Sequence, residues 1–262
     1  MTDKPSTDKP ENHAPENQAA ENQAAENRET EKQKTFAFVV YPGLTALDLV
    51  GPLQVLAGLA AADPGMRVVV VGETLDPIDT DSPLRIAPSH TFDAIPDPYA
   101  ILVPGGAAPT LRALANRTLI GYLAQAAETA ELVTSVCTGS LLLGEAGLLK
   151  GRKATTHWMF RDLLRASGAT PVAERWVEDG PVITAAGVSA GIDLALHLVE
   201  RLAGTEVARI VQFGIEYDPQ PPLGPLDWAN APHGNLTPLR EHALREGLAD
   251  HPELMAKLLA HA

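Results

Sequence analysis

The residue best suited to covalent chemistry in this chain is Cys137, in the sequence Ser-Val-Cys-Thr-Gly-Ser. An apolar run from Leu132 to Val136 ends directly at this cysteine, and helical sequence follows it. Ser135 and Gly139 are both small, as a sharp turn from strand to nucleophile to helix requires, because larger flanking side chains would collide there. The pattern therefore predicts a cysteine nucleophile on a strand–helix turn.

The predicted turn gives the thiol two sources of electrostatic stabilisation. The sulfur would lie at a helix N-terminus, whose partial positive charge favours the thiolate and lowers the thiol pKa. The backbone N–H of Thr138 is expected to point into the site, together with an N–H from the loop that contains Gly105 and Gly106. Such donors could stabilise a developing negative charge. The two glycines are equally compatible with simply ending a strand.

A thiolate nucleophile needs a proton-transfer partner. Thr138 occupies the position directly after the cysteine where a histidine could have served, so Asp48 is the better candidate. Asp48 lies in an almost wholly apolar segment, residues 44–52. A carboxyl group in that setting is either a helix-start acid or a functional group with a raised pKa. Its expected place at the same sheet edge as Cys137 favours the functional interpretation.

His157 is a weaker candidate for the same site. It follows a short predicted strand and could reach the cysteine, although a single histidine is more often structural. The other histidines show no metal-ligand spacing, and the segment 185–193 is not a G-x-G-x-x-G loop. The sequence therefore predicts no metal and no nucleotide. Segment 185–193 is interpreted instead as a helix start that packs against the site.

Apolar strands that alternate with helices must position these residues. Such a pattern predicts an α/β fold with a mostly parallel central sheet covered on both faces. Ligands bind beyond the carboxyl ends of the strands in such sheets, which selects the loops 41–48, 104–108 and 137–140. The expected strands are 36–40, 68–71, 100–103, 132–136, 152–156 and 181–185, with a hairpin or edge strand at 85–93; the expected helices are 45–61, 109–130, 138–147, 158–167, 188–203, 205–217 and 236–261.

The chain divides into three predicted regions. Residues 1–34 contain no Val, Ile, Leu, Phe, Trp, Tyr or Cys and repeat Glu-Asn every five residues, so this polar tail is expected to be disordered. Residues 35–220 form the α/β domain. Residues 221–262 form an extended arm and C-terminal helices, which could pack on their own domain or on a partner subunit.

Composition excludes several classes of function. The formal net charge is −13, without a basic stripe, which argues against nucleic-acid binding. No apolar run is long enough to cross a bilayer, and the polar N-terminus does not resemble a secretory signal. Cys137 is the single cysteine, so an intramolecular disulfide is impossible. These features predict a cytoplasmic protein with no membrane partner.

Five motifs in order resemble the ThiJ/PfpI superfamily over about residues 35 to 220. The Cys-Thr-Gly-Ser form, with an aspartate in the first loop, is similar to the isonitrile hydratase branch. The resemblance implies a flavodoxin-like three-layer sandwich, like the class I glutamine amidotransferase domain. The motifs are Leu47-Asp48-Leu49-Val50-Gly51-Pro52, Val103-Pro104-Gly105-Gly106, Ser135-Val136-Cys137-Thr138-Gly139-Ser140, Ala154-Thr155-Thr156-His157-Trp158 and Ala190-Gly191-Ile192-Asp193, with Glu216-Tyr217-Asp218-Pro219-Gln220-Pro221-Pro222 similar to the C-terminal segment of the branch.

The resemblance also implies an activity: a homodimer that hydrates an isonitrile to an N-substituted formamide without a cofactor. Cys137 resembles the nucleophile that attacks the terminal isonitrile carbon and forms a thioimidate. Asp48 resembles the acid–base partner that protonates that carbon and later activates water. Thr138 resembles the neighbour that orients substrate or water.

Other functions stay open at this point. The Cys-Thr-Gly-Ser and Thr-His-Trp motifs also resemble the ligand-sensing domain of AraC-type transcription regulators. Only about 40 residues follow Pro222 and they are not basic, which disfavours a DNA-binding region after it. Cys137 could instead serve a redox sensor, in which the thiol is oxidised. Another hydrolase or a glyoxalase-type enzyme of the superfamily is a further alternative.

Overall fold

The computed structural model describes residues 33–260. The predicted disordered tail, residues 1–34, lies outside the described residues except for its last two positions. Among the described residues, no helix is both long and apolar enough to span a bilayer.

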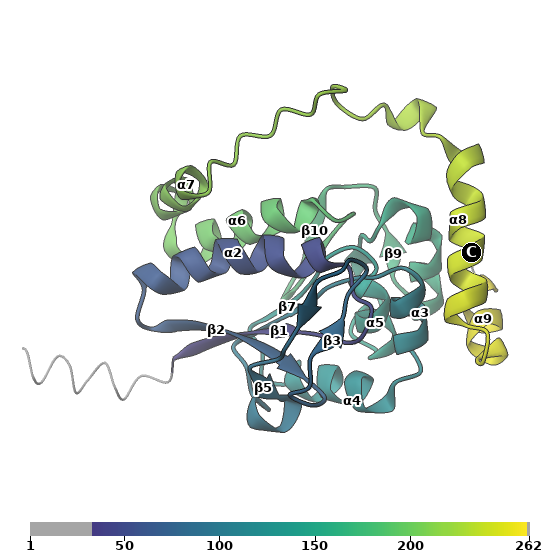
Figure 1. Ribbon diagram of the computed structural model, residues 1–262, viewed down its shortest axis with the longest axis horizontal. Coiled ribbons are helices and arrows are strands. Elements are labelled where there is room, and N and C mark those ends of the chain that lie inside the picture. The colour runs from purple at the N-terminus through teal and green to yellow at the C-terminus, as the bar shows by residue number, and fades with distance from the viewer. Residues whose placement is uncertain (1–32, 261–262) are drawn as a thin grey trace, which may run out of the picture. The chain divides into compact units, whose positions relative to one another are not determined.

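A seven-stranded sheet forms the centre of the fold (Figure 1). Its strand order is β10-β11-β7-β6-β1-β2-β5, and only the pair β10–β11 is antiparallel. The consecutive parallel core β2-β1-β6-β7-β11 has the flavodoxin-like order 2-1-3-4-5. The strands are β1 (Lys34–Val39), β2 (Met66–Gly72), β5 (His90–Thr91), β6 (Ala100–Val103), β7 (Leu132–Ser135), β10 (Trp176–Asp179) and β11 (Val182–Ala185).

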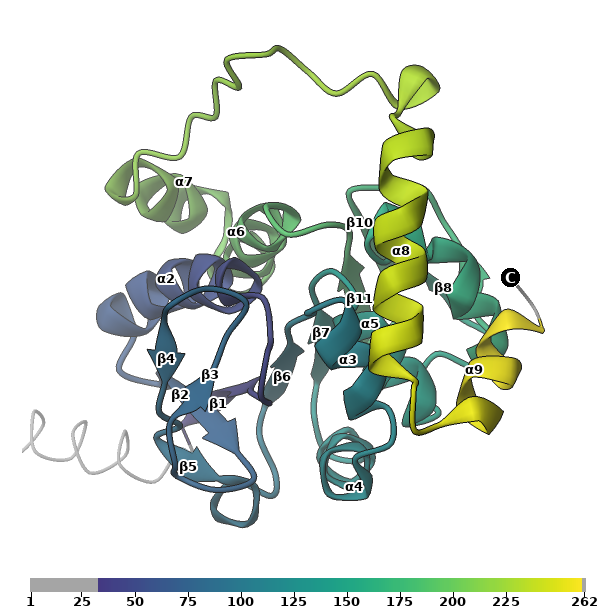
Figure 2. The ribbon, with the colours of Figure 1, turned by 45° about the vertical axis from the view of Figure 1, so that its right-hand side comes forward.

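Helices cover both faces of this sheet, so its central strands are buried (Figures 1 and 2). Three helices contact one another on one face, and three lie on the other. The α/β three-layer fold with a mostly parallel sheet, predicted from the sequence, is confirmed. The first group is α2 (Ala46–Ala62), α6 (Ala190–Ala203) and α7 (Thr205–Gly214); the second is α3 (Ala108–Ala113), α4 (Arg117–Ala126) and α5 (Gly139–Glu145).

The single helix predicted over 109–130 is wrong, because the chain forms α3 and α4 with a break between them. Asn116 lies at the break, and its side chain accepts a hydrogen bond from the N–H of Leu119 at 3.1 Å. This side-chain cap satisfies a donor that a helix start leaves unpaired. A local capping interaction therefore restarts the helix in an otherwise continuous helical pattern.

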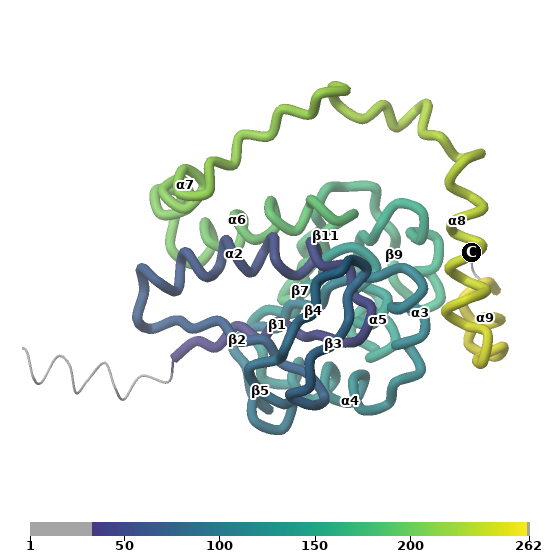
Figure 3. Tube along the Cα trace, viewed as in Figure 1, coloured from purple at the N-terminus to yellow at the C-terminus, as the bar shows by residue number. Residues whose placement is uncertain are grey.

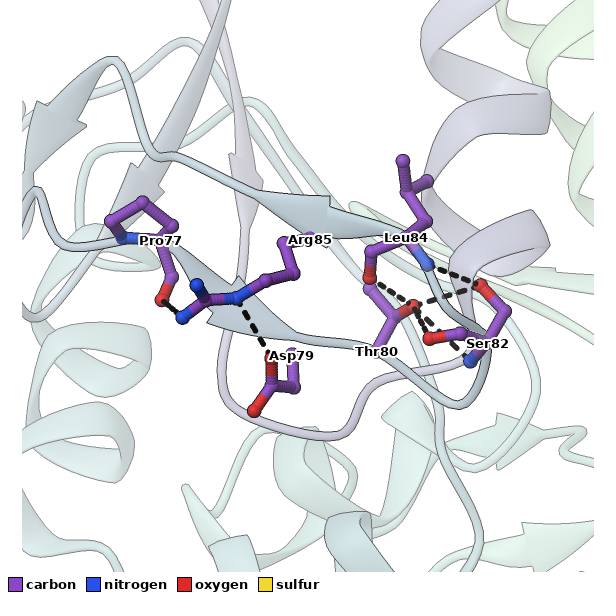
Figure 4. Close-up of polar contacts among 6 residues, drawn as sticks. All are labelled: Pro77, Asp79, Thr80, Ser82, Leu84 and Arg85. Atoms are coloured by element: carbon purple, nitrogen blue, oxygen red, sulfur yellow. Dashed lines mark hydrogen bonds and ion pairs between the residues drawn. The ribbon is translucent and has the colours of Figure 1, made fainter.

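Residues 78–91 form a small hairpin and an edge strand. Strands β3 (Ile78–Asp79) and β4 (Arg85–Ile86) pair antiparallel, while β5 joins the main sheet. Arg85 forms an ion pair with Asp79 at 2.9 Å across the hairpin, and Thr80 bonds Ser82 and Leu84 in its turn (Figure 4). A 3₁₀ turn, Phe92–Ala94, follows β5.

The region after α5 contains short elements before the sheet resumes. Strands β8 (Lys153–Ala154) and β9 (Thr170–Pro171) form a separate two-stranded sheet, and the helix predicted at 158–167 is the 3₁₀ helix η2 (Trp158–Ser167). Strand β10 was not predicted. It pairs only with β11, and its alternating burial gives a weaker sequence signal than the continuous apolar strands.

The C-terminal helices pack on their own chain. α8 (His233–Gly247) contacts α3, and α9 (Pro252–Leu259) contacts η2. A Cβ atom on Gly247 would lie 2.5 Å from the carbonyl oxygen of Ala108, so the helices approach closely. In contrast, every residue from 218 to 230 is exposed, including the 3₁₀ turn η3 (Trp228–Asn230), on the segment that leads from α7 to α8 (Figure 3).

Candidate functional site

Cys137 lies on a strained turn between β7 and α5. Its φ angle is +58°, in the left-handed region that residues other than glycine seldom occupy. Its N–H donates to the carbonyl oxygens of Ala185 (3.2 Å) and Ala186 (2.8 Å), and its own carbonyl accepts from Oγ1 of Thr156 at 2.7 Å. Surrounding hydrogen bonds of this kind hold a strained backbone in place.

Gly139, two positions after the cysteine, is a steric requirement. A Cβ atom on Gly139 would lie 2.1 Å from the carbonyl oxygen of Val103 and 2.8 Å from that of Pro104. Backbone oxygens cannot move aside as a flexible side chain could. The close approach of α5 to the end of β6 therefore demands glycine, which agrees with the turn expected from the sequence.

Asp48 is completely buried in the first turn of α2. Its Oδ2 accepts a hydrogen bond from the N–H of Gly105 at 2.9 Å, whereas its Oδ1 has no hydrogen-bond partner among the described residues. Burial raises the pKa of Asp48 from its ordinary 3.8 to about 7, although the Gly105 N–H and the Cys137 thiol oppose the shift. Near neutral pH the carboxyl is therefore poised to take up or release a proton.

Cys137 and Asp48 are close enough to perturb each other's ionisation. Burial, followed by the negative charge of Asp48, raises the pKa of the Cys137 thiol, and the N–H groups of Thr138 and Val188 lower it less strongly. The expectation that the helix N-terminus would lower this pKa overall is wrong, because the side chain is only 5% exposed and loses its hydration. The buried pair therefore retains a proton at neutral pH.

The hydroxyl of Thr138 is bonded to the loop after β6. Its Oγ1 accepts from the N–H groups of Gly106 (3.0 Å) and Ala107 (3.3 Å), and it lies 2.9 Å from Oγ1 of Thr110. Because Tyr41 donates to the carbonyl of Pro104, Thr110 donates to Tyr41 and Thr138 donates to Thr110. The Thr138 hydroxyl is thus fully engaged, while its backbone N–H lowers the pKa of the Cys137 thiol.

The two glycines after β6 hold side chains of the site. The N–H of Gly105 donates to Asp48, and the N–H of Gly106 donates to Thr138. The expectation that these N–H groups would face a developing negative charge on a substrate is therefore not supported, since both already have acceptors. They position the carboxyl and the hydroxyl instead.

Val188 is a site residue that sequence reasoning did not find. Its backbone N–H acts on the Cys137 sulfur alongside that of Thr138. Segment 185–193 was expected to pack against the site, and the bonds from the Cys137 N–H to Ala185 and Ala186 agree with that expectation. Because the contact is made by the backbone, no side-chain type in the sequence could have identified it.

His157 borders the site without bonding to its ionisable groups in the described structure. Its Nδ1 accepts from the N–H of Met159 at 3.4 Å, and a Cβ atom on Gly187 would lie 2.9 Å from its Cδ2. Burial and the charge of Arg161 lower the pKa of His157, which favours the neutral ring. His157 therefore packs against the loop that carries Val188.

The arrangement suits covalent chemistry in which Cys137 and Asp48 hold one proton between them. Among residues 33–260, no group of three His, Cys, Asp or Glu side chains gathers to hold a metal ion. The site instead combines a buried cysteine thiol, a carboxyl whose pKa is raised to about 7, and two N–H groups that favour negative charge on the sulfur. These are the parts of a nucleophilic mechanism with acid–base assistance.

Known proteins share this architecture. A protein described as isonitrile hydratase from Pseudomonas putida is 43% identical over 206 residues, which cover 79% of this chain and 88% of that protein. The crystal structure of a THiJ/PfpI family protein from Pseudomonas syringae matches with a TM-score of 0.75 and 38% identity, over 86% of this chain and 90% of that chain.

A transcription regulator is also similar. The HTH-type transcriptional regulator CdhR of Pseudomonas aeruginosa is 30% identical over 180 residues, which cover 67% of this chain and 53% of the regulator. The model of the DJ-1/PfpI family matches residues 34–201, most of the described α/β fold. This chain therefore belongs to the DJ-1/PfpI family.

Proposed function

We propose that this protein hydrates isonitriles to N-substituted formamides, with Cys137 as nucleophile and Asp48 as its acid–base partner. The observation that carries the proposal is the buried carboxyl of Asp48, with a pKa of about 7, beside a buried thiol on a strained turn. The similarity to a Pseudomonas putida protein described as isonitrile hydratase supports the choice of substrate.

The first step joins the thiol to the isonitrile. The sulfur attacks the terminal carbon, and the proton of the Cys137–Asp48 pair moves to the same carbon, so that one C–S and one C–H bond form as the C≡N bond becomes C=N. The product is a neutral thioimidate. The N–H groups of Thr138 and Val188 stabilise the negative charge on the sulfur as it loses its proton.

The second step releases the product. The Asp48 carboxylate takes a proton from water, whose oxygen adds to the thioimidate carbon, and that proton then passes from Asp48 to the nitrogen. The C–S bond breaks as the hydroxyl becomes the formamide carbonyl, and the hydroxyl proton returns to the Cys137–Asp48 pair. Oδ2 is already held by Gly105, so Oδ1 is the oxygen proposed to exchange protons. Water and isonitrile supply every atom of the formamide, and no cofactor is required.

The other predicted site residues have supporting roles in this proposal. Thr138 contributes its backbone N–H, while its hydroxyl holds the loop of Gly106. Gly105 orients the carboxyl of Asp48. His157 packs against Gly187 at the border of the site and exchanges no proton in this mechanism.

We further propose that two copies of the chain associate as a homodimer in the cytoplasm. Apolar side chains stand exposed on α7 and on the segment that follows it: Phe213 is 83% and Leu223 is 97% exposed. Burying them against a second copy would be favourable. Sedimentation of the wild type as a dimer, and of Phe213→Asp as a monomer at the same concentration, would support this assembly. A monomeric wild type would contradict it.

A ligand-sensing role is the second candidate, and the similarity to the regulator CdhR favours it. Binding of a small molecule without turnover would distinguish this role from hydration. A redox-sensing role is less well supported, because oxidants react with the thiolate and burial raises the pKa of the Cys137 thiol.

Incubation with cyclohexyl isocyanide tests the proposal directly. The wild type should form the corresponding formamide, detected by mass spectrometry. Cys137→Ala should be inactive, and Asp48→Asn should turn over about 10² to 10⁴ times more slowly. Intact-mass analysis of Asp48→Asn should reveal the thioimidate if attack still occurs. A wild type that converts neither alkyl nor aryl isonitriles would refute the hydratase function.

A further inference from the structure

A carboxylate outside the reacting pair lies at the centre of a polar cluster. Asp193, in the first turn of α6, binds two residues that are distant in sequence. Its Oδ2 accepts from Nε of Arg175 at 2.7 Å, and its Oδ1 accepts from the hydroxyl of Tyr217 at 2.9 Å. Arg175 also donates to Oγ of Ser189 at 3.2 Å. We refer to Arg175, Ser189, Asp193 and Tyr217 as the Asp193 clamp.

The clamp is connected to the nucleophile through the backbone. The carbonyl of Arg175 accepts from the N–H of Ala186 at 2.9 Å, and the carbonyl of Ala186 accepts from the N–H of Cys137 at 2.8 Å. The loop 186–189 is therefore tied to Cys137 at one end. At its other end, the side chain of Arg175 binds Ser189, the direct neighbour of Val188.

The N–H of Val188 depends on this loop for its position. It is one of two N–H groups that act on the Cys137 sulfur, and the other, from Thr138, belongs to the strand–helix turn itself. Within the loop, Gly187 packs against the ring of His157 without space for a side chain. The loop is thus confined between the nucleophile, His157 and the clamp.

We propose that Asp193 is a positioning residue for Cys137, because it fixes Arg175 and Tyr217 and thereby holds loop 186–189 with the Val188 N–H directed at the sulfur. The proposal deepens the proposed function by assigning a task to two motifs that the reacting groups leave unused, Ala190-Gly191-Ile192-Asp193 and the segment around Tyr217. It rests on that function only in taking Cys137 as the nucleophile.

The sign of the effect separates positioning from simple electrostatics. Removing the negative charge of Asp193 would by itself favour the Cys137 thiolate and make the thiol more acidic. Loss of the Val188 N–H would have the opposite effect, because a donor to the charged form is removed. A role limited to stability would change the melting temperature and leave the thiol unaltered.

A matched control lies between the same elements. Glu178 of β10 is hydrogen-bonded to His197 and forms an ion pair with Arg201, both of α6, further from the loop than the clamp is along both elements. Both substitutions remove a carboxylate that connects β10 to α6. Asp193 makes this connection at the start of both elements, and Glu178 makes it further along them. Glu178→Gln leaves the hydrogen bonds of loop 186–189 in place.

The alkylation rate of the full-length protein by iodoacetamide measures the effect, since Cys137 is the single cysteine. At about pH 8, below the raised pKa of the Cys137 thiol, Asp193→Asn should react about tenfold more slowly than the wild type, equivalent to one pKa unit. Tyr217→Phe retains the charge and should react more slowly by a smaller factor. Glu178→Gln should match the wild type.

Rates for Asp193→Asn and Tyr217→Phe that equal or exceed the wild-type rate would overturn the proposal. If circular dichroism shows that Asp193→Asn does not fold, the alkylation rate of Tyr217→Phe decides by itself. A rate equal to that of the wild type would then contradict the positioning role of the clamp. No isonitrile enters this experiment. A wild type without hydratase activity would therefore refute the proposed function and leave the alkylation result intact.

Discussion

Gly105 and Asp48 are in direct contact: the Gly105 N–H donates to Oδ2 of Asp48 at 2.9 Å, and a Cβ atom on Gly105 would lie 2.9 Å from the same oxygen. That atom would also lie 2.5 Å from the backbone nitrogen of Thr138. The loop after β6, the first turn of α2 and the turn after β7 therefore meet at this glycine. The contact fixes where the carboxyl stands relative to Cys137.

Gly105→Ala should consequently damage the site. The added methyl group would displace Asp48 or Thr138, with a loss of about 1 to 3 kcal/mol in the free energy of unfolding. A displacement near 1 Å is expected to lower kcat/KM by about 10²-fold. Gly121→Ala is the control, because Gly121 is an exposed position within α4 and an added Cβ atom there would meet no other atom within 4 Å. Equal activities of the two variants in the formamide assay would contradict this prediction.

The stability of the fold should depend on pH through Asp48. Its pKa is about 7 in the folded chain and ordinarily 3.8, so the folded state binds the proton more tightly. The contribution of Asp48 to the free energy of unfolding is therefore largest below about pH 4 and falls as pH rises towards 7, by on the order of 4 kcal/mol. Urea unfolding of the wild type and Asp48→Asn from about pH 4 to 8 measures this, and parallel curves would refute it.

The activity should have its own pH dependence. The doubly protonated Cys137–Asp48 pair lacks an anionic nucleophile or base, whereas the pair with one proton can supply both thiolate and acid. We expect kcat/KM for isonitrile hydration to rise with pH up to about 7, the pKa of Asp48, and to level off above it. The rising limb should be absent from the residual activity of Asp48→Asn. A wild-type profile that is flat between about pH 5 and 8 would exclude this assignment.

The hydroxyl of Thr138 should contribute to the stability of the fold. Thr138→Val keeps the shape of the side chain and leaves the N–H groups of Gly106 and Ala107 without their acceptor. An unsatisfied buried donor costs about 1 to 3 kcal/mol, so thermal unfolding should occur at a lower temperature. Thr138→Ser retains the acceptor and should restore most of the stability. A Thr138→Val variant as stable as the wild type would show that these bonds contribute little.

Much of the site could be predicted from short-range patterns. The apolar strand before Cys137 and the glycine two positions after it indicated the turn, because such a turn imposes a close approach in which a side chain at position 139 would clash with the end of β6. Asp48 stood out as the carboxyl in an apolar segment, and the periodicity of strands and helices indicated the layered fold. These features depend on neighbours in sequence and on general rules of chain packing.

Tertiary structure alone decided the electrostatics and the hydrogen-bond partners. The sequence predicted a thiol made more acidic by a helix, but burial beside Asp48 raises its pKa. The N–H of Gly105, expected to face substrate, binds a carboxylate 57 positions away. Desolvation and the choice of acceptor depend on which distant groups surround an atom. For that reason the sequence indicated Cys137 and Asp48 as candidates, and only the folded chain determined the burial that raises both pKa values and the backbone N–H groups that act on the sulfur.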